Sequence, residues 1–194
     1  MTSNLLLDTK EILRYMGISL QKADSRTLSL IEECKKEIEN YLQPRYALLR
    51  FPLQINQNNI TISDLTFYSS DLAKNLSSCE EVYMFAATIG PQVDMMIKRY
   101  QKLNMAKSVV FNAVAITAIE AYCDFINDQI KNQAVLEGKK LKPRYSPGYG
   151  DCPLEVQKPF LKLLNAERLC GIVHSEGDLM IPEKSVTAFA GIYK

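Results

Sequence analysis

The sequence feature that most constrains the fold is an unbroken apolar run, VYMFAATI, at Val82–Ile89. A run of this kind suits a strand whose two faces are both buried. Gly90 and Pro91 end the run, and a proline is well placed in the first turn of a helix, which we expect over Pro91–Leu103. The run therefore predicts a buried central strand that leads directly into a helix.

A second long apolar stretch, Val109–Ile126, lies in a helical region that we expect from about Met105 to Leu136, with Gly138 as its stop. The stretch is long enough to suggest a membrane span. Polar residues interrupt it, however, and the carboxylate of Glu120 lies near its middle. A charged group at that depth is costly in lipid, so the pattern favours a buried helix of a soluble protein.

Capping residues mark two helices in the N-terminal part of the chain. Asp8 and Glu11 have the spacing of a capping box, and Gly17 ends the short helix that follows them. Asp24 can cap a second helix, whose apolar stripe continues to Leu42 before Pro44 ends it. We therefore predict a helical N-terminal segment at about 1–44.

The remaining segments are shorter. We predict strands at Tyr46–Leu53 and Ile60–Ile62 joined as a hairpin, helices at Asp71–Leu76, near Val156–Leu164 and near Ala166–Cys170, and a β-rich tail at Leu179–Tyr193. Helices and strands are mixed along the chain without a regular β-α-β alternation. We therefore predict an α+β fold, a single domain over 1–194 with a largely antiparallel twisted sheet and packed helices.

Composition excludes several classes of function. The chain has 23 basic and 22 acidic residues, so we expect neither nucleic acid nor a membrane as a partner. Five cysteines without C-x-x-C spacing, and a first segment without a basic leader, predict reduced thiols and a cytoplasmic protein. The single histidine, His174, is expected to be structural, and we predict no metal site and no acid–base catalytic residue.

One segment, Lys142–Pro153, combines rigidity with polar chemistry. Three prolines and two glycines in its sequence KPRYSPGYGDCP fix an extended, turning backbone. The same segment carries a guanidinium, two phenols, a hydroxyl and a carboxylate. Polar groups on a rigid loop commonly form binding sites. The alternative is a structural turn that only joins two helices.

The residues R-x-x-P-G-Y-x-x-C-P at Arg144–Pro153 resemble the R-x-x-P-G-Y-P-x-C-P signature of the reactivation domain of cobalamin-dependent methionine synthase, which binds S-adenosylmethionine. The resemblance continues in Ile119–Phe125, in Leu163–Glu167 and Gly171, and in the pattern M-x-P-x-x-S-V at Met180–Val186. It covers roughly residues 80–190 and implies the fold of the methionine synthase activation domain.

The resemblance also implies a set of ligand contacts. The residues expected to bind S-adenosylmethionine are Glu120, Arg144, Ser146, Gly148 and Tyr149. An arginine fork suits the ligand's carboxylate, and Glu120 suits its ammonium or sulfonium. Gly148 lets the backbone approach the ligand, backbone groups around Ser146 meet the adenine, and Tyr149 faces the corrinoid.

This arrangement requires Glu120 and Arg144 to face one cavity, with a ligand-sized gap between their charged ends. The alternatives are a structural salt bridge for Glu120 and a surface ion pair for Arg144. Cys152 and Pro153 are expected to shape the loop, with the thiol buried rather than reactive.

The implied activity is reductive methylation of cob(II)alamin, an accessory methyltransferase role that works by proximity. S-adenosylmethionine supplies the methyl group, and a flavodoxin-like reductant supplies an electron. The D-x-H-x-x-G corrinoid motif needs a histidine that this sequence lacks at such a position, so cobalamin is expected to come with a partner, the cobalamin-binding domain of methionine synthase. The alternatives are reactivation of another corrinoid methyltransferase, and a corrinoid-domain binding module without activity towards S-adenosylmethionine.

Two departures from the family pattern bear on the site. Gly150 stands where the family has proline, and Asp151 follows it, which predicts a looser loop. The family also uses an acidic residue in an N-terminal segment to hold the ligand's ammonium, and residues 1–70 contain no recognisable equivalent.

Overall fold

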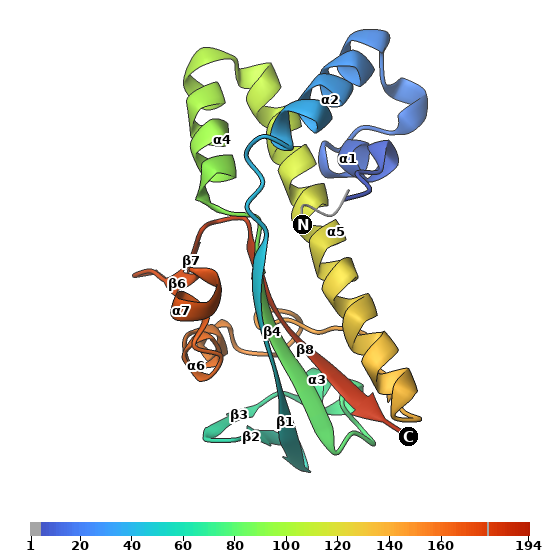
Figure 1. The fold of residues 1–194 in the computed structure, drawn as a ribbon, viewed down its shortest axis with the longest axis vertical. Helices are drawn as coiled ribbons and strands as arrows, with labels where there is room; N and C mark the ends of the chain where they lie inside the picture. Colours follow the sequence, from blue (N-terminus) through green and yellow to red (C-terminus); the bar gives the residue numbers. More distant parts are fainter. Residues whose placement is uncertain (1–4, 178) are drawn as a thin grey trace.

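The computed structural model describes residues 5–177 and 179–194 (Figure 1). In chain order the elements are α1 (Thr9–Tyr15), the 3₁₀ helix η1 (Leu20–Lys22), α2 (Ser25–Ile38), β1 (Arg45–Asn56), β2 (Asn59–Ile62), β3 (Leu65–Tyr68), α3 (Ser70–Asn75), β4 (Glu81–Thr88), α4 (Pro91–Leu103), α5 (Met105–Leu136), β5 (Lys140–Leu141), the 3₁₀ helix η2 (Leu154–Val156), α6 (Gln157–Leu163), α7 (Ala166–Cys170), β6 (Val173–His174), β7 (Met180–Ile181) and β8 (Ser185–Tyr193).

The main sheet has six strands in the order β3-β2-β1-β4-β8-β5, and each neighbouring pair is antiparallel. β4, the predicted apolar run, pairs with β1 on one side and with β8 on the other. A second, two-stranded sheet joins β6 and β7. The predicted α+β fold with an antiparallel sheet is confirmed.

The alternation of side chains along β4 explains why the whole run is apolar. Tyr83 and Phe85 belong to a core on one face of the sheet, while Val82 and Met84 belong to a core on the other face. Helix α5 packs along the first face, α1, α2 and α4 pack around α5 (Figure 1), and all four contribute to the first core, while α3, α6 and α7 contribute to the second. A central strand between two helical layers needs apolar residues at every position.

Helix α5 runs along most of the length of the molecule in Figure 1. By length and composition it could span a membrane. Its apolar residues, among them Phe111, Val114 and Ile126, are instead buried in the core that it shares with α1, α2 and α4. Burial in this core accounts for the apolarity of α5, as predicted from the carboxylate in its middle.

Most predicted elements are confirmed, and Asp8 and Asp24 cap their helices as expected. The reciprocal half of the predicted capping box is wrong, because Glu11 forms an ion pair with Arg14 at 2.6 Å. Asp8 accepts a hydrogen bond from the Lys10 amide (2.9 Å), and Asp24 accepts one from the Thr27 amide (2.7 Å). Strands β3 and β5 were not predicted. Both are short and depend on pairing with a neighbouring strand more than on a pattern of their own.

Candidate functional site

The loop between β5 and η2, here called the ligand loop (residues 142–153), begins as an extension of the sheet. The Lys142 amide donates to the Gly191 carbonyl (2.8 Å). Tyr145 and Phe189 then exchange two backbone hydrogen bonds, at 2.9 and 2.7 Å. The first half of the loop is therefore held against the edge of β8, and beyond Tyr145 the chain turns away from that edge.

A cavity of about 380 Å³ opens where the loop leaves β8. This volume lies in the range of small-molecule sites. Its walls come from α5, the ligand loop, the start of α6, β7 and the first residues of β8. The lining residues are Glu120, Arg144, Tyr145, Ser146, Pro147, Tyr149, Gln157, Met180, Ser185, Val186 and Thr187.

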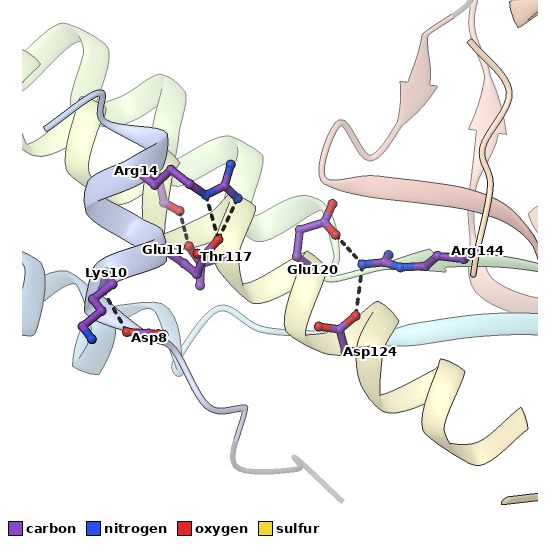
Figure 2. A network of polar contacts seen from close by, with 9 residues as sticks. Asp8, Lys10, Glu11, Arg14, Thr117, Glu120, Asp124 and Arg144 are labelled. Atoms are coloured by element: carbon purple, nitrogen blue, oxygen red, sulfur yellow. Dashed lines mark hydrogen bonds and ion pairs between the residues drawn. The ribbon is translucent and has the colours of Figure 1, made fainter. Parts of the chain in front are cut away.

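Arg144 is held by two carboxylates of α5. Its Nη2 donates to Glu120 Oε2 at 2.7 Å and to Asp124 Oδ1 at 3.0 Å (Figure 2). Glu120 and Asp124 are four residues apart, so both lie on the same face of the helix. We call these three residues the Arg144 cluster. Its formal charge is −1, because one guanidinium faces two carboxylates.

The structure corrects one expectation about this cluster. Glu120 and Arg144 do face one cavity, but the predicted gap between their charged ends is wrong, because the two groups form a direct ion pair. The carboxylates of α5 are the anions nearest to the guanidinium, and they hold it by charge-assisted hydrogen bonds. The ion pair and the cavity, which the sequence suggested as alternatives, occur together.

The other predicted loop residues take different positions. Ser146 and Tyr149 line the cavity, and Tyr149 is 70% exposed. Gly148 is not among the lining residues. It has a φ of +85°, and its amide donates to the Cys152 carbonyl at 2.9 Å, so it closes the turn of the loop. Cys152 is buried, and burial raises the pKa of its thiol to about 11, as expected for an unreactive cysteine.

Sequence reasoning missed several lining residues. Gln157 and Thr187 are only 5% and 2% exposed, yet both border the cavity. Thr187 precedes Phe189 by two residues on β8, so it presents its backbone N–H and C=O on the same open edge of the strand. Nothing in the sequence pattern distinguishes these residues from ordinary core positions. Asp124 could have been found, because it follows Glu120 by one helical turn.

The far end of the ligand loop is fixed to α3. Asp151 Oδ1 accepts a hydrogen bond from Ser69 Oγ (2.5 Å), and Oδ2 accepts from the amide and the hydroxyl of Ser70 (2.7 and 2.6 Å). The looser loop predicted from Gly150 and Asp151 is therefore wrong. The loop is bonded to β8 at one end and to α3 at the other.

These features define an α+β protein with a cavity at the open edge of its antiparallel sheet, bordered by an ion cluster with one surplus negative charge. Residues 25–193 match the model of the family described as vitamin B12 dependent methionine synthase, activation domain, and the chain belongs to that family. The family resemblance seen in the sequence is thereby confirmed.

The fold is also found among solved structures. The chain is similar to the structure titled "Crystal Structure of the MetH Reactivation Domain bound to AdoHcy", with a TM-score of 0.73 and 15% sequence identity. The alignment covers 95% of this chain and 73% of that one. At this identity the likeness establishes the shared fold. A search of curated proteins found no match.

Proposed function

We propose that the cavity beside the Arg144 cluster binds S-adenosylmethionine, and that the protein presents its methyl group for the reductive reactivation of a cobalamin-dependent methionine synthase. Membership of the activation-domain family supports the reactivation role. The observation that carries the proposal is the Arg144 cluster itself, a guanidinium between two carboxylates at the wall of a cavity of ligand size.

The charge of the cluster complements that of the ligand. S-adenosylmethionine carries a carboxylate, an ammonium and a sulfonium, so its formal charge is +1 and the cluster's is −1. On binding, the ligand's carboxylate pairs with the guanidinium of Arg144. Glu120 is then free to face the ligand's ammonium or sulfonium. The ion pair between Glu120 and Arg144 is then exchanged for two ion pairs with the ligand. Asp124 keeps the guanidinium oriented from the solvent side.

The rest of the predicted site completes the proposal. Backbone groups around Ser146 and the open edge at Thr187 offer donors and acceptors to the adenine. Gly148 sets the turn that brings Ser146 and Tyr149 to the cavity. Tyr149, at the mouth and largely exposed, is the residue that we place towards the corrinoid. Residues 1–194 would act as one unit that includes the helical segment at about 1–44.

The chain's part in the chemistry is positional. Its residues hold the sulfonium so that the methyl group points out of the cavity past Tyr149, which is proximity catalysis. Cobalamin would come with the cobalamin-binding domain of methionine synthase. Reduced by one electron from a flavodoxin-like reductant, it would take the methyl group, and S-adenosylhomocysteine would be left in the cavity. We expect these encounters to take place in the cytoplasm.

The experiment is a reactivation assay. A methionine synthase lacking its own reactivation domain, with its cobalamin oxidised to cob(II)alamin, is mixed with the chain, S-adenosylmethionine and a flavodoxin-type reductant. We expect the cob(II)alamin absorption to disappear and turnover to return only when the chain and S-adenosylmethionine are both present. Recovery without the chain would contradict the proposal.

If S-adenosylmethionine binds but the synthase does not recover, the client is a different corrinoid methyltransferase. If no S-adenosylmethionine binds, a corrinoid-domain binding module remains.

A further inference from the structure

We propose that Asp151 is a positioning residue of the ligand site, which fixes the end of the ligand loop to α3 and so places Ser146, Pro147 and Tyr149 at the cavity. The inference rests on the proposed function, because it concerns the same site. It assigns a role to the residue that directly follows Gly150, the position at which the loop departs from the family signature.

The carboxylate of Asp151 is saturated with hydrogen bonds from one short segment. In addition to the bonds from Ser69 and Ser70, Oδ1 accepts from the Asp71 amide at 3.1 Å. In return, the Asp151 amide donates to Asp71 Oδ2 at 3.3 Å. Each of the two carboxylate oxygens accepts two hydrogen bonds. Asp151 is therefore the most extensively hydrogen-bonded residue of the loop.

These bonds hold Asp151 in its charged form. Hydrogen bonds from the Ser69 and Ser70 side chains, followed by those from the backbone amides, lower the pKa of the Asp151 carboxyl well below its usual range. The contact therefore persists throughout the neutral range of pH.

The segment that receives Asp151 is itself fixed. Ser69 is fully buried, and its hydroxyl also accepts a hydrogen bond from the Leu72 amide at 3.1 Å, which caps α3. Leu72 of α3 and Leu76, the residue that caps its C-terminal end, are fully buried in the core on that face of the sheet. Asp151 thus anchors an exposed loop to an element that cannot shift without disturbing the core.

Gly150 is what allows the approach. It has a φ of +51°, and a Cβ at this position would collide with Asp71 Oδ2 and Tyr145 Oη. A proline, with its φ fixed near −65°, cannot adopt this conformation. The Tyr145 hydroxyl in turn donates to the Tyr149 carbonyl at 3.1 Å, inside the same loop. Gly150 therefore lacks the rigidity of the family's proline, but it lets the loop come close enough to α3 for Asp151 to form its hydrogen bonds.

The segment between the two anchors carries the lining residues. The Tyr145–Phe189 bridge fixes one end and Asp151 fixes the other, so residues 146–150 have little freedom. Without the second anchor this segment would sample several conformations, and only some would place Tyr149 and Ser146 against a ligand. The apparent affinity falls in proportion to the competent fraction.

The test combines ligand affinity with a measurement of loop order. S-adenosylmethionine is titrated by calorimetry into the wild-type chain and into Asp151→Ala and Asp151→Asn, each well below its own melting temperature. Hydrogen exchange is followed at Gly148, Tyr149 and Cys152, whose amides donate within the loop. Glu155→Ala is the matched control, because Glu155 is also an exposed acid close to the loop, in η2.

We expect Asp151→Ala to weaken binding about tenfold or more and to speed exchange at the three amides. Asp151→Asn retains one carbonyl acceptor and should recover part of both losses. Glu155→Ala should match the wild type.

Two results would overturn the inference. One is wild-type affinity in Asp151→Ala, whatever the exchange in the loop, and the other is a loss of affinity without faster exchange at the three amides. A wild-type chain that binds no S-adenosylmethionine would instead overturn the proposed function, and the positioning role with it. The failures are distinguishable, because the first two appear only in the variants.

Discussion

Two arginine clusters tie α5 to the rest of the molecule, and they differ in charge balance. Arg50 of β1 pairs with Glu81 at 2.5 Å and with Glu137 at 2.7 Å, and Lys139 pairs with the same two carboxylates at 2.6 and 3.7 Å. We call these four residues the Arg50 cluster. Two cations face two anions in it, whereas in the Arg144 cluster one cation faces two anions.

Under the proposed function, the difference separates a structural role from a binding role. The Arg50 cluster satisfies its own charges where the C-terminal end of α5 meets β1 and β4. The Arg144 cluster has a surplus negative charge and borders the 380 Å³ cavity. A cationic ligand can balance the surplus charge of the Arg144 cluster, whereas the charges of the Arg50 cluster already balance one another. Variants of the Arg144 cluster should therefore affect ligand binding, and variants of the Arg50 cluster should affect stability.

The largest effect is expected from Arg144→Ala. Loss of a charge that pairs with the ligand's carboxylate should weaken S-adenosylmethionine binding by roughly 2–5 kcal/mol. Arg144→Lys should recover only part of it, because an ammonium cannot reproduce the bidentate fork. Calorimetry on both variants checks this. Decarboxylated S-adenosylmethionine is the control ligand, and the Ala variant should bind it about as well as the wild type does.

Arg50→Ala should lower the stability of the fold and leave the affinity for the ligand unchanged. Removing the guanidinium leaves Glu81 and Glu137 with Lys139 as their remaining cation, and we expect a loss of about 1–2 kcal/mol in the free energy of unfolding. Urea denaturation measures this loss. The affinity for S-adenosylmethionine should stay at the wild-type value, and a variant that lost affinity while remaining folded would remove the distinction between the clusters.

Glu120→Gln should weaken S-adenosylmethionine binding by about 1 kcal/mol and change the binding of S-adenosylhomocysteine less. The second ligand lacks the sulfonium charge, so it gains less from the surplus carboxylate. Asp124→Asn is the matched comparison. Its side chain is 69% exposed against 38% for Glu120, so solvent should screen its contribution and its effect should be smaller. Equal effects in the two variants would argue against a distinct role for Glu120.

The smallest effect concerns pH and the Arg50 cluster. The hydrogen bond from Arg50, then that from Lys139, lowers the pKa of Glu81 to about 2 in the folded protein. An unfolded glutamate titrates near about 4.3. The stabilisation from Glu81 is therefore present above about pH 4.3 and is lost as the pH falls from there towards 2.

Urea midpoints at pH 5 and pH 3 test this sign. Glu81→Gln should lose less stability than the wild type between the two values, because it has no carboxylate to protonate. Identical losses would show that the carboxyl does not contribute as described.

Sequence reasoning predicted elements that carry their own signals. Pro91 begins α4 and Gly138 follows the end of α5, as predicted, and both signals act locally. The structure adds the cap of α5, Asn104, which accepts a hydrogen bond from the Lys107 amide. The two-residue strand β5 has no such signal, because it exists only through its pairing with the end of β8.

The same contrast holds at the site. Arg144, Ser146 and Tyr149 belong to a recognisable motif, whereas Gln157 and Thr187 reach the cavity only through tertiary packing. The Gly150–Asp151 pair was visible in the sequence, but its effect was misjudged. Its partner, Ser69–Asp71, lies about eighty residues earlier in the chain, and no local pattern connects the two segments.

The most direct test of the central claim is a calorimetric titration of the wild-type chain with S-adenosylmethionine, supported by the shift in melting temperature on ligand addition. We predict a dissociation constant in the micromolar range, which corresponds to about 8 kcal/mol. We also predict a rise in melting temperature as the ligand concentration increases. No binding heat and no thermal shift at millimolar ligand would contradict the claim that the Arg144 cluster and its cavity form an S-adenosylmethionine site.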